Sequence, residues 1–199
     1  MGADTFWSSI NNEPKRKYKY VVEWGDVPWF VVSKTDLPKY TNGETEVNAL
    51  NHTFYYPGRI KWETITMEIT DSESLNSAKT LQKKLIQSGY AFPKNANQFQ
   101  TISKKSAVEA LGQLVLKEIT GGGAPGTSQG GLVSEPARVI GEWTFKNAWI
   151  KESDNGGSKE YASDDVQKIT LTVRYDWAQY KAYALEDAPY IGESFDIPE

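Results

Sequence analysis

The sequence predicts a mainly β protein, an antiparallel β-sandwich or barrel with one capped helix on its flank. Three observations carry this prediction: strict alternation of apolar and polar residues in 60–70, turn signals between several such segments, and a helix start directly after that strand. Alternation with a period of two places one set of side chains in a core and the other at a wetted or partner-facing surface. The apolar set is Ile65, Met67 and Ile69, and the polar set is Thr64, Thr66, Glu68 and Thr70.

The N-terminal part of the chain predicts an arm and a hairpin. Residues 1–17 are polar and form the expected arm. Segments 18–24 and 29–33 are apolar and aromatic, and the turn signal at Gly25 between them predicts that they pair as a hairpin. Pro38 ends the second strand, because proline cannot donate to a β-ladder.

A second hairpin is expected around the Asn-Gly pair at 42–43, the strongest short-range turn signal. Its arms are polar and charged, so we expect it to project away from the core. The hairpin consists of Tyr40, Thr41, Asn42, Gly43, Glu44, Thr45 and Glu46.

A helix is expected after residue 70. Thr70 with Glu73 fits a capping box, and Asp71 is an alternative cap. Gly89 supplies the stop. Apolar residues at spacings of three to four predict a stripe that covers the apolar face of the sheet: Leu75, Ala78, Leu81, Leu85 and Ile86.

The rest of the main domain, residues 18–177, holds an insertion and two strands. The insertion, 91–139, predicts a second helix continuing to Ile119 and then a loop of flexible, glycine-rich composition. Alternating segments within 139–150 and 166–175 predict the two closing strands.

The C-terminal segment 178–199 is acidic. Its aromatic residues would either dock on a neighbouring molecule or belong to a disordered terminus. Both interpretations stay open.

The composition limits the function. With 199 residues and 39% hydrophobic content the chain suffices for a single core, and 7 Trp, 11 Tyr and 7 Phe favour strands, cores and protein interfaces. Zero cysteines exclude disulfides and thiolate metal sites. A net charge of −4 disfavours tight binding of nucleic acid. No apolar run reaches the roughly 20 residues of a membrane span, so no membrane anchoring by this chain is expected.

No catalytic, cofactor or metal site is predicted, and we expect a protein that is not an enzyme. His52 is the only histidine, which precludes a two-histidine metal site. The glycine-rich segment 120–126 lacks the Gly-Lys-Ser/Thr ending of a phosphate loop. Two alternatives remain: a carboxylate pair brought together by folding, and a tryptophan platform that stacks on sugars or single strands.

Taken in order, these parts resemble the tail tube protein of T4-type contractile-tailed bacteriophages and of related contractile injection systems. The segments that carry the resemblance are the aromatic strand 18–24, Leu-Pro at 37–38, Pro-Gly-Arg at 57–59, the strand 62–67 and the ending 173–177. The segments 91–139 and 178–199 have no counterpart in it.

The resemblance implies a hexameric ring whose inner sheets join into one barrel, with rings stacked into a tube. The implied partners are further copies of the chain, a tail sheath protein, baseplate and tail-terminator proteins, and DNA that passes without sequence-specific binding. The implied location is the virion, after assembly in the host cytoplasm. The hairpin 40–46 would bridge successive rings. The polar side chains that would line the channel are Thr64, Thr66, Glu68, Lys168, Thr170 and Thr172.

The resemblance leaves several roles open. The leading one is a tail tube subunit for genome passage. The alternatives are the tube subunit of an injection machine with protein cargo and a baseplate protein that initiates the tube. A carbohydrate-binding β-sandwich is a further alternative.

Overall fold

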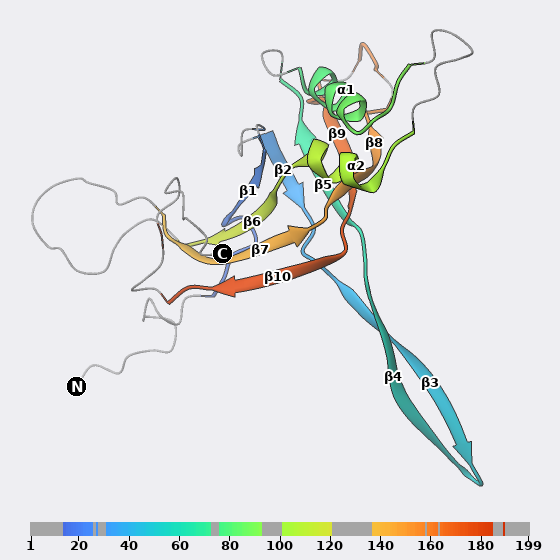
Figure 1. Ribbon diagram of the computed structural model, residues 1–199. Coiled ribbons are helices and arrows are strands. Elements are labelled where there is room, and N and C mark those ends of the chain that lie inside the picture. Colours follow the sequence, from blue (N-terminus) through green and yellow to red (C-terminus); the bar gives the residue numbers. More distant parts are fainter. Residues whose placement is uncertain are drawn as a thin grey trace, which may run out of the picture. The chain divides into compact units, whose positions relative to one another are not determined.

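The computed structural model describes residues 14–25, 27, 31–72, 76–92, 101–120, 137–157, 159–162, 164–184 and 189 (Figure 1). The chain forms two compact units. The smaller comprises Met1–Val22, Leu116–Trp143 and Tyr180–Glu199, and the larger comprises Glu23–Val115 and Thr144–Gln179.

The described elements follow in chain order. They are β1 (Tyr20–Trp24), β2 (Val32–Thr35), β3 (Tyr40–Ala49), β4 (His52–Trp62), β5 (Ile65–Thr70), α1 (Ser77–Gln87), α2 (Lys104–Leu111), β6 (Leu114–Ile119), β7 (Val139–Lys146), β8 (Trp149–Asp154), β9 (Lys168–Arg174) and β10 (Trp177–Ala182). The predicted class, mainly β with antiparallel sheets, is confirmed, and the described residues contain two helices, one after β5 and one in the insertion, as expected.

The larger unit is built on a four-stranded sheet of order β2-β5-β9-β8. Its central strands β5 and β9 alternate as expected, with one buried and one partly exposed side chain in turn. The buried set has at most 1% exposure and comprises Ile65, Met67, Ile69, Ile169, Leu171 and Val173. The predicted apolar face of this sheet is therefore confirmed.

A second four-stranded sheet has the order β1-β6-β7-β10, and the smaller unit contains most of β1, β6 and β7 and half of β10. The start of the segment expected as an acidic tail is thus a strand, up to Ala182. Beyond it, the Tyr183 backbone N–H donates to the Ile140 carbonyl at 3.0 Å. Residues 185–188 and 190–199 of that segment lie outside the described residues, as do 1–13 of the N-terminal arm and 121–136 of the glycine-rich loop.

Lys15 holds the described end of the arm on the smaller unit. Its ammonium is ion-paired with Glu118 and donates to the Tyr180 hydroxyl at 3.0 Å. Tyr180 lies so close over Gly141 that a Cβ there would collide with its ring, and Trp143 packs beside it with ring centroids 4.7 Å apart. A larger residue at position 141 would therefore displace the Tyr180 ring from its place over β7.

The expected first hairpin is wrong, because β1 and β2 belong to different sheets. After β1 the chain turns at Gly25 (φ 50°), and the Val27 N–H donates to the Trp24 carbonyl at 2.9 Å. Among the described residues, this turn closes a single bridge, between Trp24 and Val27, and β2 pairs instead with β5. The strand that pairs with β2 is β5, which is distant in the sequence, so the local turn signal at Gly25 does not identify it.

Two expected strands are each divided. The expected strand 60–70 is interrupted at 63–64, where the Glu63 N–H donates to the Lys39 carbonyl at 2.8 Å. The expected strand 139–150 breaks at Asn147, whose φ of 54° lies in the left-handed region. Each break allows its two halves to join different pairings.

Helix α1 begins later than expected. Its N-cap is Asn76, whose side chain accepts from the Lys79 N–H, while Asp71 Oδ1 accepts from the Ser77 N–H at 2.9 Å. The expected caps at Thr70 and Asp71 are therefore wrong, although Asp71 does satisfy one of the free N–H groups of the first turn. Gly89 (φ 102°) ends the helix as expected.

The expected apolar stripe on α1 is largely wrong. Leu81 is buried, but Leu85 and Ile86 are 42% and 50% exposed, and Ala78 is exposed. Leu75 lies outside the described residues. Two large apolar side chains of α1, Leu85 and Ile86, are therefore about half exposed.

Helix α2 is capped by Ser103 and ends at Leu111. The expectation that it continues to Ile119 is wrong, because Gly112 (φ 79°) leaves the helical region and Leu114–Ile119 forms β6. Apolar residues at 114–116 are all buried in this strand.

Among the described residues, no helix is long and apolar enough to cross a membrane.

Candidate functional site: the long hairpin and the polar sheet face

Strands β3 and β4 of the larger unit form a two-stranded antiparallel ribbon that projects from the sheet of that unit (Figure 1). Eleven residues in β4 correspond to roughly 35 Å at the usual rise per residue. The turn lies at Leu50, with φ 53°, and Asn51. A projecting hairpin is thus present, but the expected turn at Asn42-Gly43 is wrong, since the whole segment 40–46 lies in the first arm.

Two glycines explain why Asn42-Gly43 does not turn. The register shifts between Asn42 and Glu44, where Gly43 faces Gly58 across the ribbon. A Cβ on Gly58 would lie 2.9 Å from the Gly43 carbonyl carbon and 3.0 Å from its oxygen. A Cβ on Gly43 would meet its nearest atoms, in Arg59, at an ordinary 3.6 Å. The ribbon therefore needs a glycine at Gly58 more than at Gly43.

Aromatic rings join the base of the hairpin to the core of the larger unit. Tyr40 and Trp62 pack with centroids 5.2 Å apart, and Trp62 lies 6.0 Å from Tyr175. Tyr175 is 2% exposed, packs on Phe145 at 5.0 Å, and has its pKa raised by burial. These contacts stabilise the direction in which the ribbon leaves the sheet.

The distal half of the ribbon has two chemically different faces. Directly opposed residues share a face in an antiparallel pair, and successive pairs alternate. The apolar hairpin face comprises Thr45, Val47, Ala49, His52, Phe54 and Tyr56, and the acidic hairpin face comprises Glu44, Glu46, Asn48, Thr53, Tyr55 and Pro57. Same-face contacts agree: the His52 and Phe54 rings lie 4.6 Å apart, and Thr53 Oγ1 donates to Asn48 Oδ1 at 2.7 Å.

The polar face of the β2-β5-β9-β8 sheet contains the residues expected to line a channel. Cross-strand partners are Thr66 with Thr172, Glu68 with Thr170, and Thr70 with Lys168. Of the expected set, only Thr64 lies outside the strands, in the break between β4 and β5. The structure therefore brings Thr66, Glu68, Lys168, Thr170 and Thr172 together on one face.

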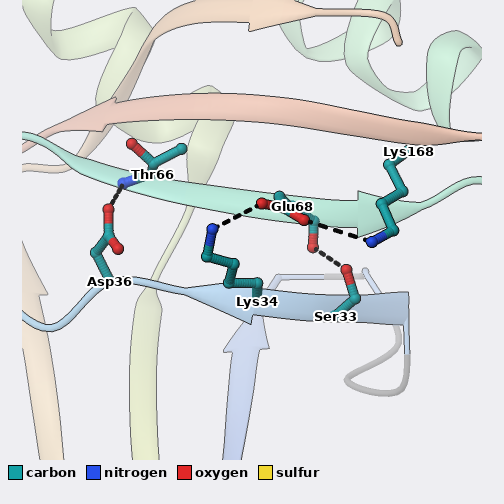
Figure 2. A network of polar contacts seen from close by, with 6 residues as sticks. All are labelled: Ser33, Lys34, Asp36, Thr66, Glu68 and Lys168. Atoms are coloured by element: carbon teal, nitrogen blue, oxygen red, sulfur yellow. Dashed lines mark hydrogen bonds and ion pairs between the residues drawn. The ribbon is translucent and has the colours of Figure 1, made fainter.

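Glu68 is the centre of a charge network on this face (Figure 2). Lys34 donates to Glu68 Oε1 at 3.0 Å, and Lys168 lies 3.7 Å from Oε2. At the next pair, the Thr66 N–H donates to Asp36 Oδ2 at 3.1 Å. Lys34 and Asp36 were not expected here from the sequence, because only the long-range pairing of β2 with β5 places them on this face.

The network shifts the pKa values of its members. The hydrogen bond from Lys34 lowers the pKa of Glu68, and the same bond raises the pKa of Lys34. Lys34 and Lys168 both lie next to the Glu68 carboxylate, whose negative charge stabilises their positive charges. The charged side chains of this face are partly exposed, and Glu68 forms ion pairs with both Lys34 and Lys168.

Glu68→Gln is expected to lower Tm slightly at neutral pH, because it removes both ion pairs at a partly exposed site. A lowered carboxylate pKa stabilises the fold above the unfolded-state pKa of about 4.5 and loses that contribution as the pH falls through the folded-state value. The Tm difference from wild type should therefore shrink in acid. Thermal melts from pH 7 to pH 3 measure it, with Glu152→Gln on β8 as control. A difference that grows in acid would contradict the assignment.

The remaining candidate residues are occupied in packing or lie apart. Among the described tryptophans, Trp24 is buried, three others are partly buried, and Trp177 is 47% exposed. Mainly packed tryptophans do not favour the sugar-platform alternative. His52 lies on the exposed hairpin. Within the described ranges, no three His, Asp or Glu side chains gather as a metal site would require.

The two-faced sheet and projecting hairpin define a fold that occurs in contractile injection assemblies. The chain is similar to the tube-terminating cap of the anti-feeding prophage, with TM-score 0.55, 16% identity and coverage of 85% of this chain and 92% of that one. It is also similar to a chain of the six-fold symmetrised anti-feeding prophage baseplate (0.52, 12%, 85% and 97%) and of the PVC extracellular contractile injection system in its sheath/tube terminator structure (0.52, 14%, 85% and 97%). No protein-family model and no curated protein matches the sequence.

These likenesses establish the fold. They confirm the expected resemblance at that level, for tube and cap proteins of contractile injection assemblies and not for a phage tail tube in particular.

Proposed function

We propose that the chain is a structural, non-enzymatic subunit of the inner tube of a contractile injection apparatus. The observation that carries the proposal is the combination of this fold with an uncovered ribbon, whose exposed side chains include Val47, Phe54 and Tyr56. Contiguous exposed apolar surface marks interaction sites in folded proteins. Strands β2 and β8 are the edge strands of the sheet in the larger unit. Pairing with a strand of a neighbouring copy would satisfy their free backbone groups.

In the proposed assembly six copies close into a ring, and the hairpin, including 40–46, contacts the next ring. The polar face around Glu68 lines the channel, together with Thr64, Thr66, Lys168, Thr170 and Thr172. Paired charges on this wall suit passage of cargo, because a wall that neutralised phosphates would release counterions and retain DNA.

The cargo we favour is protein. The three similar structures come from a tube-terminating cap, a baseplate and an extracellular contractile injection system, which support an injection machine over a genome-carrying virion. Sheath and baseplate proteins are the proposed partners besides further copies of the chain.

Negative-stain electron microscopy of the purified protein over a concentration series tests the proposal. Rings or stacked tubes with a central channel are the expected result. A monomer at every concentration would contradict a tube subunit and would favour a tube-initiating or terminating role, which co-assembly with a baseplate preparation would then examine.

Gly58→Ala is expected to block ring stacking while the monomer stays folded. The new Cβ would lie within 3.0 Å of Gly43 backbone atoms, so the ribbon must distort, but its hydrogen-bonded neighbours lie outside the core of the larger unit. Tube length by electron microscopy and Tm are the two measurements.

Gly43→Ala is the matched control, because its Cβ has only contacts of 3.6 Å or more. Equal losses of tube length in both variants would contradict the proposed close approach. A large loss of Tm in Gly58→Ala would show instead that the ribbon is part of the core.

A further inference from the structure

The sequence contains two Asn-Gly pairs, at 42–43 and at 155–156, and the structure places them in different settings. Asn42 lies within β3 and pairs with Ile60, so its backbone is extended and belongs to the ladder of the ribbon. Asn155 directly follows the last residue of β8 and is exposed. The two glycines after it have φ of 95° and 65°, which places this pair in a turn and not in a strand.

The chemistry of an Asn-Gly pair depends on the backbone nitrogen of the glycine. Once deprotonated, this nitrogen attacks Cγ of the preceding asparagine to form a cyclic imide, and the side-chain Nδ2 leaves as ammonia. Glycine favours this step because it has no Cβ to obstruct the approach. Water then opens the imide at either carbonyl carbon, which yields aspartate or isoaspartate. A backbone that is held in a β-ladder must first open before the ring can close.

Hydrogen bonds and close packing restrain the turn after β8. Asp154 Oδ1 accepts from the Gly156 N–H at 3.1 Å, and Gln167 Nε2 donates to the Asn155 carbonyl at 2.7 Å. The turn is tight, because a Cβ on Gly156 would lie 2.6 Å from the Lys168 carbonyl oxygen. The nitrogen that would attack is therefore in an exposed turn, but a carboxylate restrains it.

We propose that Asn155 is a modification site, which deamidates spontaneously at a rate that Asp154 limits. The Asp154 carboxylate opposes the reaction in two ways. It retains the Gly156 hydrogen in a hydrogen bond, and its negative charge disfavours the nitrogen anion. Asn42 reacts more slowly still, because its reaction requires the ribbon to open locally. The net reaction consumes one water and releases one ammonia, so it needs no further reagent.

The modification changes the end of an edge strand. Either product adds a carboxylate beside Asp154, at the end of β8. Isoaspartate also adds a methylene to the main chain next to Gly156, and this should displace the last ladder pair of β8, Asp154 with Thr170. Since the proposed function has β8 pair with a neighbouring copy, we expect modified chains to join rings less well. This consequence rests on the proposed function, whereas the deamidation itself does not.

Ageing of the purified full-length protein tests the proposal. The protein is incubated in mildly alkaline buffer, and peptide mass spectrometry measures the conversion of amide to acid at each asparagine, with isoaspartate separated by chromatography. Asn155 should convert about tenfold faster than Asn42 or more, which corresponds to ~1.4 kcal/mol of barrier. Equal rates at the two sites, or faster conversion of Asn42, would overturn the proposal.

Variants of β8 test the role of Asp154. Asp154→Ala should accelerate the conversion of Asn155 by roughly two- to tenfold, the factor that the net free energy of a typical hydrogen bond gives. Asp154→Asn retains an acceptor oxygen without the charge and should give an intermediate rate. Glu152→Ala is the matched control, because it removes a carboxylate of the same strand that lies opposite Thr172, away from the turn. An unchanged rate in both Asp154 variants, or equal acceleration by Glu152→Ala, would overturn this role.

The effect on assembly is measured by electron microscopy of fresh and aged protein. Asn155→Gln should keep its assembly on ageing, because its longer side chain closes a ring far more slowly, whereas the wild type should lose assembly as Asn155 converts. Conversion without loss of assembly would overturn the consequence for β8. Absence of rings in fresh protein would contradict the proposed function, and the conversion rates would still decide the deamidation.

Discussion

Trp24→Ala is expected to destabilise the protein by about 3–5 kcal/mol, the usual cost of deleting a buried large aromatic side chain. Trp24 is 1% exposed, and its indole N–H donates to the Leu111 carbonyl at 3.1 Å. The Lys84 ammonium lies 5.4 Å from the ring centroid and also donates to the Ala110 carbonyl at 3.0 Å. One side chain thus connects the end of β1, α1 and the end of α2. Urea unfolding monitored by far-ultraviolet circular dichroism measures the change.

Trp24→Phe is the matched control. It retains most of the buried ring but loses the indole hydrogen bond, so its cost should be roughly half or less of the alanine value. An alanine variant within about 1 kcal/mol of wild type, well below the usual range for such a deletion, would show that Trp24 is not part of the core.

Leu171→Lys is expected to unfold the protein, whereas Thr172→Lys is expected to leave it folded. Leu171 is 0% exposed and opposite Met67, which is also 0% exposed. An unpaired ammonium in that position costs several kcal/mol, a large part of the 5–15 kcal/mol that stabilises a typical domain. Thr172 is on the polar face, opposite Thr66 and Glu152, where an ammonium remains hydrated.

The two variants introduce the same charge at consecutive positions of β9. They therefore differ in the face of the sheet that receives the charge and not in the charge itself. Soluble yield, near-ultraviolet circular dichroism and Tm measure the outcome. If both variants folded equally well, the sheet would have no apolar interior face. If both unfolded, the face around Thr172 would be buried and could not line a channel.

Strands β5 and β9 could be predicted because their information is local. Alternation with a period of two identifies the buried residues of each strand without knowledge of its pairing partner. These are Ile65, Met67 and Ile69 on β5, and Ile169, Leu171 and Val173 on β9. The helix end at Gly89 could also be predicted, because glycine readily adopts the positive φ of a helix C-terminus. The end at Gly112 was not predicted, because the apolar spacing beyond it indicated a helix that continues. Buried apolar runs such as 114–116 fit a helix face and a strand equally well.

The errors arise where a distant partner decides. Asn42-Gly43 has the chemistry of a turn, but Gly58, fifteen positions later, pairs with it and makes it a bulge within a long arm. The actual turn at Leu50 and Asn51 carries no glycine. Lys34 reaches Glu68 only because β2 pairs with β5. Pairing across the sheet therefore determined the parts of the site that local patterns did not.

The glycine bulge at Gly43 and Gly58 constrains how the hairpin can change in evolution. Because it holds the register, each cross-strand pair beyond it has an assigned side of the ribbon. Insertion of one cross-strand residue pair between the bulge and Val47 would move every side chain beyond it to the opposite face of the ribbon. The hydrophobic and acidic surfaces would then change places. Lineages should therefore lengthen or shorten this ribbon by an even number of pairs, and odd changes should occur only together with an exchange of residue types between the two sides.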